Sequence, residues 1–175
     1  MMSDIPKTIV IREVGPREGF QIESAEIPTG EKVRLVDALS ETGLRHIEVT
    51  SFVSPKWVPQ MADAEEVAAR FQARPGVSYT ALYLNERGFE RVRETGKFAL
   101  WGHLGLAVSE AFSQRNTNRT IAETLASFPA QIVRYQELGL RIKAGLMATF
   151  GCNFEGDVPL ELVVGLVQSL VDLSQ

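Results

Sequence analysis

Two kinds of segment alternate along the chain, and they differ in the spacing of their apolar residues. Short segments rich in β-branched residues predict strands, because such residues favour the extended backbone of a sheet. Each is followed by a segment whose apolar residues recur every three or four positions, which predicts an amphipathic helix. The predicted strands cover residues 8–14, 45–50, 77–82, 98–106 and 141–148, and the predicted helices cover 31–42, 63–72, 86–95, 120–138 and 159–173.

The junctions between these segments resemble one another. Gly43, Gly96 and Gly139 each follow a predicted helix and precede a predicted strand. Glycine at such a position permits the left-handed backbone that ends a helix. Asp63 and Thr120 are each followed three residues later by a glutamate, which predicts a capping box at a helix start. The chain therefore repeats one βα unit, and such units build parallel sheets.

Two architectures accommodate repeated βα units, an open doubly wound sheet and a (β/α)8 barrel. The glycine-rich G-x-G-x-x-G fingerprint of the open sheet is missing after the first strand. A unit averages about 33 residues, so eight units need roughly 265, near the usual size of a barrel. The fold class expected is α/β, a partial (β/α)8 TIM barrel of about five βα units. Residues 1–175 would form the N-terminal portion of a single barrel domain.

Composition narrows the class of protein. The hydrophobic fraction of 45% is that of a globular protein, and the net charge of −4 argues against a nucleic-acid partner. The single cysteine, Cys152, excludes an intrachain disulfide and a multi-cysteine zinc site. No apolar run is long enough for a membrane span, and the first residues lack a signal-peptide core. We therefore expect a cytoplasmic protein with no membrane partner.

Candidate chemistry lies where the first strand ends, because parallel α/β folds collect functional groups at strand C-termini. Arg17 and Glu18 stand there between Gly15 and Gly19. Arg17 could stabilise an oxyanion or a carboxylate, and Glu18 could bind a divalent cation through its oxygens. The alternative is a solvated ion pair on a loop.

The second strand carries Glu48 between two apolar neighbours. A carboxylate facing a barrel interior needs a partner, and Arg17 is the natural one. The alternative is an edge-strand glutamate facing water. The following loop, residues 51–61, is aromatic and contains two prolines. It could form the wall of a ligand site or a packing plug.

Other polar residues have simpler interpretations. Asn85 most simply caps the helix after it. Residues 109–116 resemble a solvated loop. Cys152 has no histidine near it in sequence to activate it, so a structural role is favoured over a nucleophilic one. His46 and His103 are not spaced as a metal-binding pair.

Two strings are specific enough to resemble a known family. Residues 14–21 read VGPREGFQ, and residues 47–61 read IEVTSFVSPKWVPQM. Both resemble the hydroxymethylglutaryl-CoA lyase family, and shorter likenesses follow at residues 109–118 and 151–156. The wider group contains isopropylmalate synthase and 4-hydroxy-2-oxovalerate aldolase. The resemblance runs from about residue 8 to the end of the chain.

The resemblance implies a metal-dependent barrel that uses Mg²⁺ or Mn²⁺ and an acyl-CoA substrate. It implies retro-Claisen cleavage of 3-hydroxy-3-methylglutaryl-CoA to acetyl-CoA and acetoacetate. By position, Arg17 would stabilise the enolate oxygen, Glu48 would support Arg17 and the substrate, and Glu18 would bind the metal. Gln21 and Ser51, which lie in the two strings, would contact the substrate.

The chain departs from the family pattern in two respects. The family has Asp at the position of Glu18, and its His-x-His metal pair, a later Asn ligand and a catalytic Cys loop are not found here. A lone carboxylate makes a weak magnesium site, so we expect little or no lyase activity from this chain alone. Two alternatives stay open. One is a related acyl-CoA lyase or aldolase with another substrate. The other is a non-catalytic half-barrel that assembles with a partner chain or as a homo-oligomer.

Overall fold

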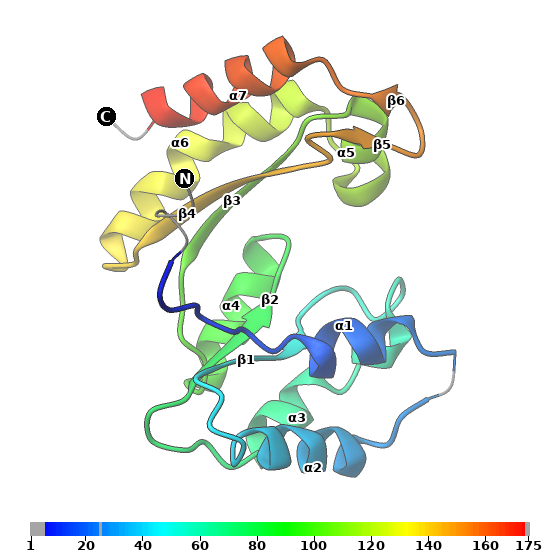
Figure 1. Cartoon of the computed structure of the whole chain (residues 1–175), viewed down its shortest axis with the longest axis vertical. Helices are drawn as coiled ribbons and strands as arrows, with labels where there is room; N and C mark the ends of the chain where they lie inside the picture. The colour runs from blue at the N-terminus through cyan, green and yellow to red at the C-terminus, as the bar shows by residue number, and fades with distance from the viewer. Residues whose placement is uncertain (1–5, 25, 174–175) are drawn as a thin grey trace. The chain divides into compact units, whose positions relative to one another are not determined.

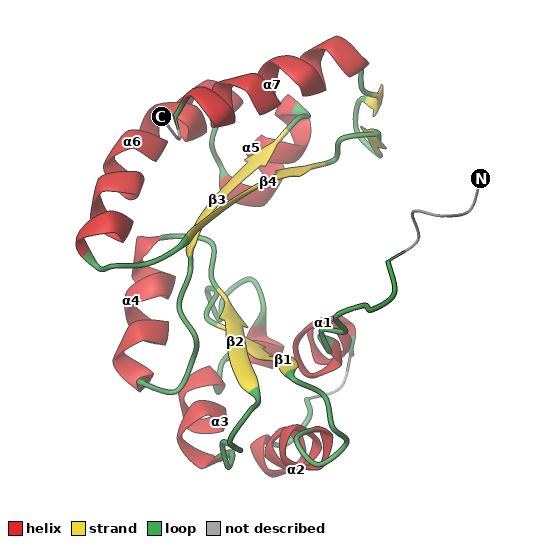
Figure 2. Cartoon of the chain, turned by 60° about the vertical axis from the view of Figure 1, so that its left-hand side comes forward, coloured by secondary structure: helices red, strands yellow, loops and turns green. Residues whose placement is uncertain are grey.

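The computed structural model of the chain describes residues 6–24 and 26–173. The chain divides into two compact units, Met1–Leu100 and Trp101–Gln175 (Figure 1). Both are α/β, with a parallel strand pair and surrounding helices (Figure 2). Each unit is described by itself below.

The first unit is built around two parallel strands, β1 and β2. Its elements in chain order are α1 (Gly15–Ile22), α2 (Thr29–Leu39), β1 (His46–Ser51), the short 3-10 helix η1 (Pro59–Met61), α3 (Ala64–Arg70), β2 (Ser78–Leu82) and α4 (Glu86–Thr95). Helices α2 and α3 pack against each other and against β1. These helices cover one face of the sheet, and α1 also contacts β1.

The core of the first unit lies under α2 and α3. Ile47 and Tyr79, which pair across β1 and β2, are buried there. The ring of Phe71 lies 4.9 Å from that of Tyr79, measured between centroids, and Phe98 also packs against Phe71. Aromatic pairs at these separations stabilise a core beyond their buried area.

The second unit contains a second parallel pair and a small hairpin. Its elements are β3 (Gly102–Ala107), α5 (Glu110–Thr117), α6 (Ile121–Glu137), β4 (Ile142–Met147), β5 (Gly151–Cys152), β6 (Gly156–Asp157) and α7 (Leu160–Asp172). Strands β3 and β4 are parallel and in continuous register, whereas β5 and β6 are antiparallel. Helix α6 packs on β3.

Several predicted helix ends and starts are confirmed. Gly43, Gly96 and Gly139 have φ angles of 88°, 64° and 66°, the left-handed values that end a helix. Thr120 forms a complete capping box at the start of α6. Asn85 caps α4 by accepting a hydrogen bond from the Gly88 amide at 2.9 Å.

The first predicted strand is not formed. Within residues 8–14 only Glu13 pairs with β1, through a bridge to Ile47. Ile9, Val10 and Ile11 are 79%, 79% and 59% exposed. The β-branched composition is correct for a strand, but a strand also needs a ladder of backbone hydrogen bonds.

Three other expectations about elements are wrong. The Arg17 motif lies on α1 rather than on a loop, because Pro16 fits the first turn of a helix, where no amide donor is needed. Residues 110–117 form α5, capped by Ser109, whose hydroxyl accepts from the Phe112 amide. Asp63 stands at the start of α3 but makes no capping bond. Among the described residues the strands form three two-stranded sheets, so the α/β class is confirmed but the count of five βα units in a partial barrel is not.

No helix in the described ranges is both long and apolar enough to cross a bilayer.

We predict that Gly102→Ala destabilises the chain, because a Cβ there would lie 2.5 Å from the ring of Tyr135. Overpacking of this kind costs about 2 kcal/mol in the free energy of unfolding, measurable by urea denaturation. Gly145→Ala on β4 is the matched control, since a Cβ at Gly145 has no neighbour within 4 Å. Equal midpoints for the two variants would contradict the packing of α6 on β3.

Candidate active site

Arg17 and Glu48 meet as an ion pair in the first unit. Nε of Arg17 donates to Oε1 of Glu48 at 2.6 Å, and the two side chains are 17% and 13% exposed. The pairing expected from sequence is therefore present. Removal of one partner from a pair this shielded from water destabilises the fold more than removal of one partner from a surface pair.

Backbone hydrogen bonds align α1 with β1. The Glu13 amide donates to the His46 carbonyl at 2.9 Å, and the Glu48 amide donates to the Glu13 carbonyl at 2.8 Å. The Glu13 carboxylate accepts from the Gly15 amide at 2.5 Å, at the first residue of α1. These bonds fix the start of the helix that carries Arg17 beside the strand that carries Glu48.

Glu18 lies on the open side of Arg17. Its carboxylate forms an ion pair with Nη1 of Arg17, and its side chain is 55% exposed. Arg17 thus lies between two carboxylates, one shielded and one exposed. These two contacts use Nε and Nη1 of Arg17, and within the described ranges no hydrogen bond from Nη2 is found.

A bulge in β1 brings Ser51 to the face of Glu48. In a regular strand, residues three apart point to opposite faces. Here Glu48 pairs with Thr80 and Ser51 pairs with Leu82, so three steps along β1 match two steps along β2. Paired residues share a face, so Glu48 and Ser51 point the same way. Thr50 turns to the other face, where its hydroxyl lies 3.6 Å from a buried methionine sulfur.

Polar atoms of this unit are buried without a hydrogen-bond partner among the described residues. They are Oε1 of Gln21, Oγ of Ser51 and Oγ1 of Thr80. Gln21 follows Arg17 by four residues on α1, so the two share a helix face. Buried polar groups are nearly always hydrogen-bonded, so unpaired atoms around an ion pair indicate a place for a polar ligand. Thr80 was missed from sequence, and only its register opposite Glu48 could have revealed it.

The loop between β1 and α3 is anchored at both ends. Phe52 and Met61 are 2% and 1% exposed, whereas Trp57 in its centre is 78% exposed. The loop thus packs against the unit at its ends, as the plug interpretation expects. Its centre presents an aromatic ring to solvent, as a ligand wall would.

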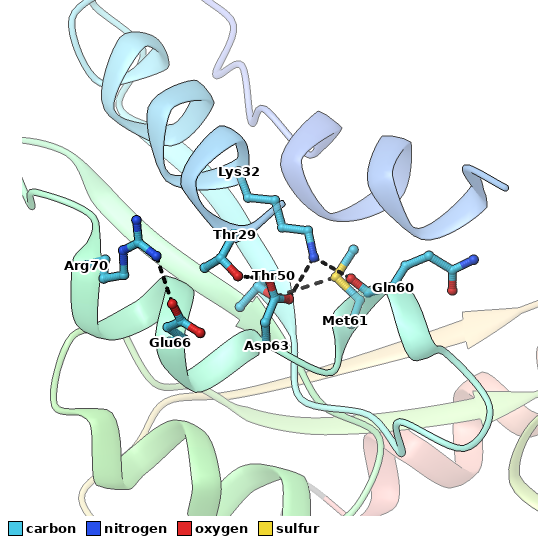
Figure 3. Close-up of polar contacts among 8 residues, drawn as sticks. All are labelled: Thr29, Lys32, Thr50, Gln60, Met61, Asp63, Glu66 and Arg70. Atoms are coloured by element: carbon cyan, nitrogen blue, oxygen red, sulfur yellow. Dashed lines mark hydrogen bonds and ion pairs between the residues drawn. The ribbon is translucent and has the colours of Figure 1, made fainter. Parts of the chain in front are cut away.

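A buried lysine ties this loop to the helices around it (Figure 3). Nζ of Lys32 donates to the Gln60 carbonyl at 2.5 Å and to Oδ1 of Asp63 at 2.7 Å, and its side chain is 7% exposed. Oδ2 of Asp63 accepts from the Thr29 hydroxyl at 2.7 Å. The Gln60 side chain donates to the Glu23 carbonyl at 2.9 Å, just after α1. The Asp63 carboxylate is therefore used in this network rather than as a helix cap.

The described residues do not form a metal site on their own. Across 6–24 and 26–173, no three His, Cys, Asp or Glu side chains are grouped closely enough to hold a metal ion. Glu18 is the one carboxylate that the sequence analysis assigned to a metal, and it is engaged by Arg17. One exposed carboxylate does not satisfy the six-oxygen shell of Mg²⁺.

In the second unit, Cys152 lies beside Ser109. Ser109 follows β3 in sequence, and Cys152 belongs to β5, which follows β4. Sγ of Cys152 is 3.0 Å from the hydroxyl oxygen of Ser109, and that hydroxyl donates its hydrogen to the Glu155 carboxylate. The contact with Ser109 lowers the pKa of the Cys152 thiol, whereas the charge of Glu155 acts in the opposite sense. Ser109 is buried and caps α5, so the thiol is held by a structural group.

We predict that Lys32→Met lowers the free energy of unfolding by about 3 kcal/mol, because it leaves the Asp63 carboxylate without its cation. Arg70→Met breaks the exposed Arg70–Glu66 pair, with side chains 49% and 58% exposed, and is the matched control. That change should cost less than about 0.5 kcal/mol. Denaturation of both variants measures the difference, and similar losses would count against the buried network.

We predict that Ser109→Ala slows alkylation of Cys152 at neutral pH. Removing the hydroxyl raises the pKa of the thiol, so less reactive thiolate is present. Glu155→Gln should act in the reverse direction, because it removes a charge that raises the pKa of that thiol. Iodoacetamide rates across pH measure both shifts, with helix content checked by circular dichroism. If the pH dependence of the alkylation rate is unchanged in Ser109→Ala, the Ser109 contact does not lower the pKa of the Cys152 thiol.

Comparisons with known proteins show which family the chain belongs to. The HMGL-like family model matches residues 8–174. A Pseudomonas aeruginosa protein named 3-hydroxy-3-isohexenylglutaryl-CoA/hydroxy-methylglutaryl-CoA lyase is 43% identical over 169 residues, which are 95% of this chain and 55% of the relative. The chain spans about half the length of the curated relatives it matches.

Solved structures give the same result. The crystal structure of the Bacillus subtilis HMG-CoA lyase superposes with a TM-score of 0.83 at 38% identity, over 96% of this chain and 56% of that one. An HMG-CoA lyase from Acinetobacter baumannii, in complex with coenzyme A and 3-methylmalate, gives a TM-score of 0.80 at 33% identity, over 94% and 53%. The family match covers nearly the whole chain and includes every residue of the Arg17–Glu48 site. The chain therefore belongs to the HMGL-like family.

Proposed function

We propose that this chain is the N-terminal portion of a (β/α)8 lyase domain that cleaves 3-hydroxy-3-methylglutaryl-CoA to acetyl-CoA and acetoacetate. The observation that carries the proposal is the shielded Arg17–Glu48 pair beside the unpartnered Gln21 and Ser51 side chains. The relatives named as lyases of this substrate, at about 40% identity, support the same reaction.

In this reaction the bond between C2 and C3 of the acyl group breaks. The 3-hydroxyl loses its proton and becomes the ketone of acetoacetate, while the bonding electrons pass to C2 and form the enolate of acetyl-CoA. A proton delivered to C2 completes the product. The negative charge develops on the thioester oxygen, so a cation fixed near that oxygen lowers the barrier.

Arg17 is the cation proposed for this role. Its guanidinium would donate from Nη2 to the enolate oxygen, while Glu48 holds the group in place through Nε. Gln21 and Ser51 would hydrogen-bond polar groups of the substrate, which satisfies their buried atoms.

The proposed cofactor is Mg²⁺ or Mn²⁺, which would supply Lewis acidity to the bound oxygens. Glu18 is the one ligand proposed from this chain, with its longer side chain in place of the family's Asp. Because the described residues do not complete a site, the other ligands would come from the rest of the lyase domain.

An apolar groove in the second unit supports the partial-barrel interpretation. Strand β4 has β3 as its only strand neighbour in the described chain, and a groove of about 730 Å³ lies between β4 and α7. Phe150 at its rim is 94% exposed. The remaining lining residues are Ala144, Gly145, Leu146, Thr149, Val158, Leu160, Val163, Val167, Leu170 and Val171. We infer that further βα units cover this groove in the complete domain.

The groove also supports the alternative hypothesis, a non-catalytic half-barrel that assembles with a partner chain. The two proposals differ in whether the assembled complex cleaves a thioester. They agree that this chain alone is inactive.

We predict that this chain gains lyase activity when mixed with the part of the Pseudomonas aeruginosa relative that it does not match, in the presence of Mg²⁺. Cleavage of 3-hydroxy-3-methylglutaryl-CoA and of its isohexenyl analogue would be followed by release of acetyl-CoA. Arg17→Met should lower the rate at least about 100-fold, because it removes the cation at the enolate oxygen. Arg34→Met is the control, since the Arg34 side chain is 77% exposed.

A stable complex of the two parts that leaves both thioesters intact would favour the non-catalytic half-barrel. Preference for the isohexenyl substrate would favour the related lyase. Equal activity of Arg17→Met and Arg34→Met would remove Arg17 from the mechanism.

A further inference from the structure

Thr80 is a half-buried residue with a buried hydroxyl oxygen, and the proposed mechanism does not use it. It lies on β2 directly opposite Glu48 of β1 in the parallel register. Its neighbour Tyr79 pairs with Ile47, and both are buried in the core under α2 and α3. Since residues alternate between faces along a strand, Thr80 points to the opposite face, the one that carries Glu48.

The Thr80 hydroxyl is buried without a partner among the described residues. The threonine on the neighbouring strand differs, because the Thr50 hydroxyl contacts the sulfur of Met61. Tyr79 differs as well, since its hydroxyl donates to Ser40 at 2.8 Å. An unpaired buried hydroxyl weakens a fold unless a ligand satisfies it. Its position beside Glu48 indicates which ligand that is.

We propose that Thr80 is a further substrate-binding residue of the Arg17–Glu48 site, and that its hydroxyl donates a hydrogen bond to an oxygen of the acyl group. This inference rests on the proposed function. Glu48 supplies only acceptor oxygens on this face, and the Arg17 guanidinium supplies charged donors. Thr80 adds a neutral donor on the second strand, so the acyl group is held from α1, β1 and β2 together.

The acyl group is a better match than the coenzyme. The 3-hydroxy-3-methylglutaryl group carries a carboxylate, a hydroxyl and a thioester oxygen within a few bonds of the cleaved bond. Thr80 shares its sheet face and register position with Glu48, which is assigned to the acyl end of the substrate. Thr80 therefore contributes to recognition of the acyl group and leaves binding of the nucleotide part of CoA unaffected.

The test is Thr80→Val, which keeps the shape of the side chain and removes the hydroxyl. In the 175-residue chain, the denaturation midpoint should stay the same or rise, because no protein hydrogen bond is lost. The dissociation constant for 3-hydroxy-3-methylglutaryl-CoA, measured by titration, should increase about tenfold, as expected for one lost hydrogen bond. The dissociation constant for CoA itself should not change. Thr80→Ser should restore the affinity, and Thr50→Val is the matched control on the opposite face.

A lower midpoint for Thr80→Val with unchanged affinity would overturn the inference, because the hydroxyl would then have a partner in the protein. Equal weakening of CoA and its thioester would also overturn it, as would the absence of detectable thioester binding to the chain. A different result would contradict the proposed function without contradicting the inference about Thr80. If Arg17→Met binds the thioester as tightly as the unaltered chain while Thr80→Val does not, Thr80 is retained as a ligand contact and the assignment of Arg17 is lost.

Discussion

The hydrogen bonds that Glu13 makes with β1 are the contacts on which the site depends. These hydrogen bonds form only one bridge between Glu13 and the strand. They nevertheless set both the distance and the rotation of α1 relative to β1. Since Arg17 lies in the first turn of that helix, a shift of the bridge by one residue would turn it away from Glu48. The shielded ion pair follows from this backbone register more than from the attraction of the two charges, because burial of charges costs much of what their attraction contributes.

Buried polar groups are used in two different ways in the first unit. Lys32, Asp63 and Thr29 satisfy one another and hold the loop after β1 against two helices. Oγ of Ser51 and Oγ1 of Thr80, on the other face of the same sheet, have no hydrogen-bond partner among the described residues, and neither has Oε1 of Gln21 on α1. A satisfied network stiffens a structure, whereas unsatisfied groups are a cost that a ligand can relieve. The core side of β1 and β2 thus carries the stiffening network, and the opposite side carries the proposed site.

Much of the fold could be predicted from the sequence, because helix periodicity and glycine terminators are local signals. The helix that carries Arg17 could not be predicted, because two glycines and a proline in a short segment are typical of a loop. In the structure Pro16 instead occupies the first turn of that helix. The failure of residues 8–14 to form a strand was also beyond sequence reasoning, because pairing depends on a neighbour rather than on β-branched residues.

The candidate site, like the fold, was predictable only in part. Arg17 and Glu48 were found because a carboxylate inside an apolar strand needs a cationic partner, and Arg17 follows the preceding predicted strand. Ser51 shares their face only because of the bulge, a feature with no sequence signal here. Thr80 carries no motif, and its importance arises from register alone.

The open edge of β4 has a consequence for the behaviour of this chain in solution. Within the described residues β4 has one strand neighbour, so its other edge is open to pairing, and that edge borders an apolar groove. Such an edge is a template for pairing with any extended polypeptide, including another copy. Self-association of the isolated chain should therefore rise with its concentration, and the same surface that favours assembly of a barrel also favours aggregation when no complementary polypeptide is present.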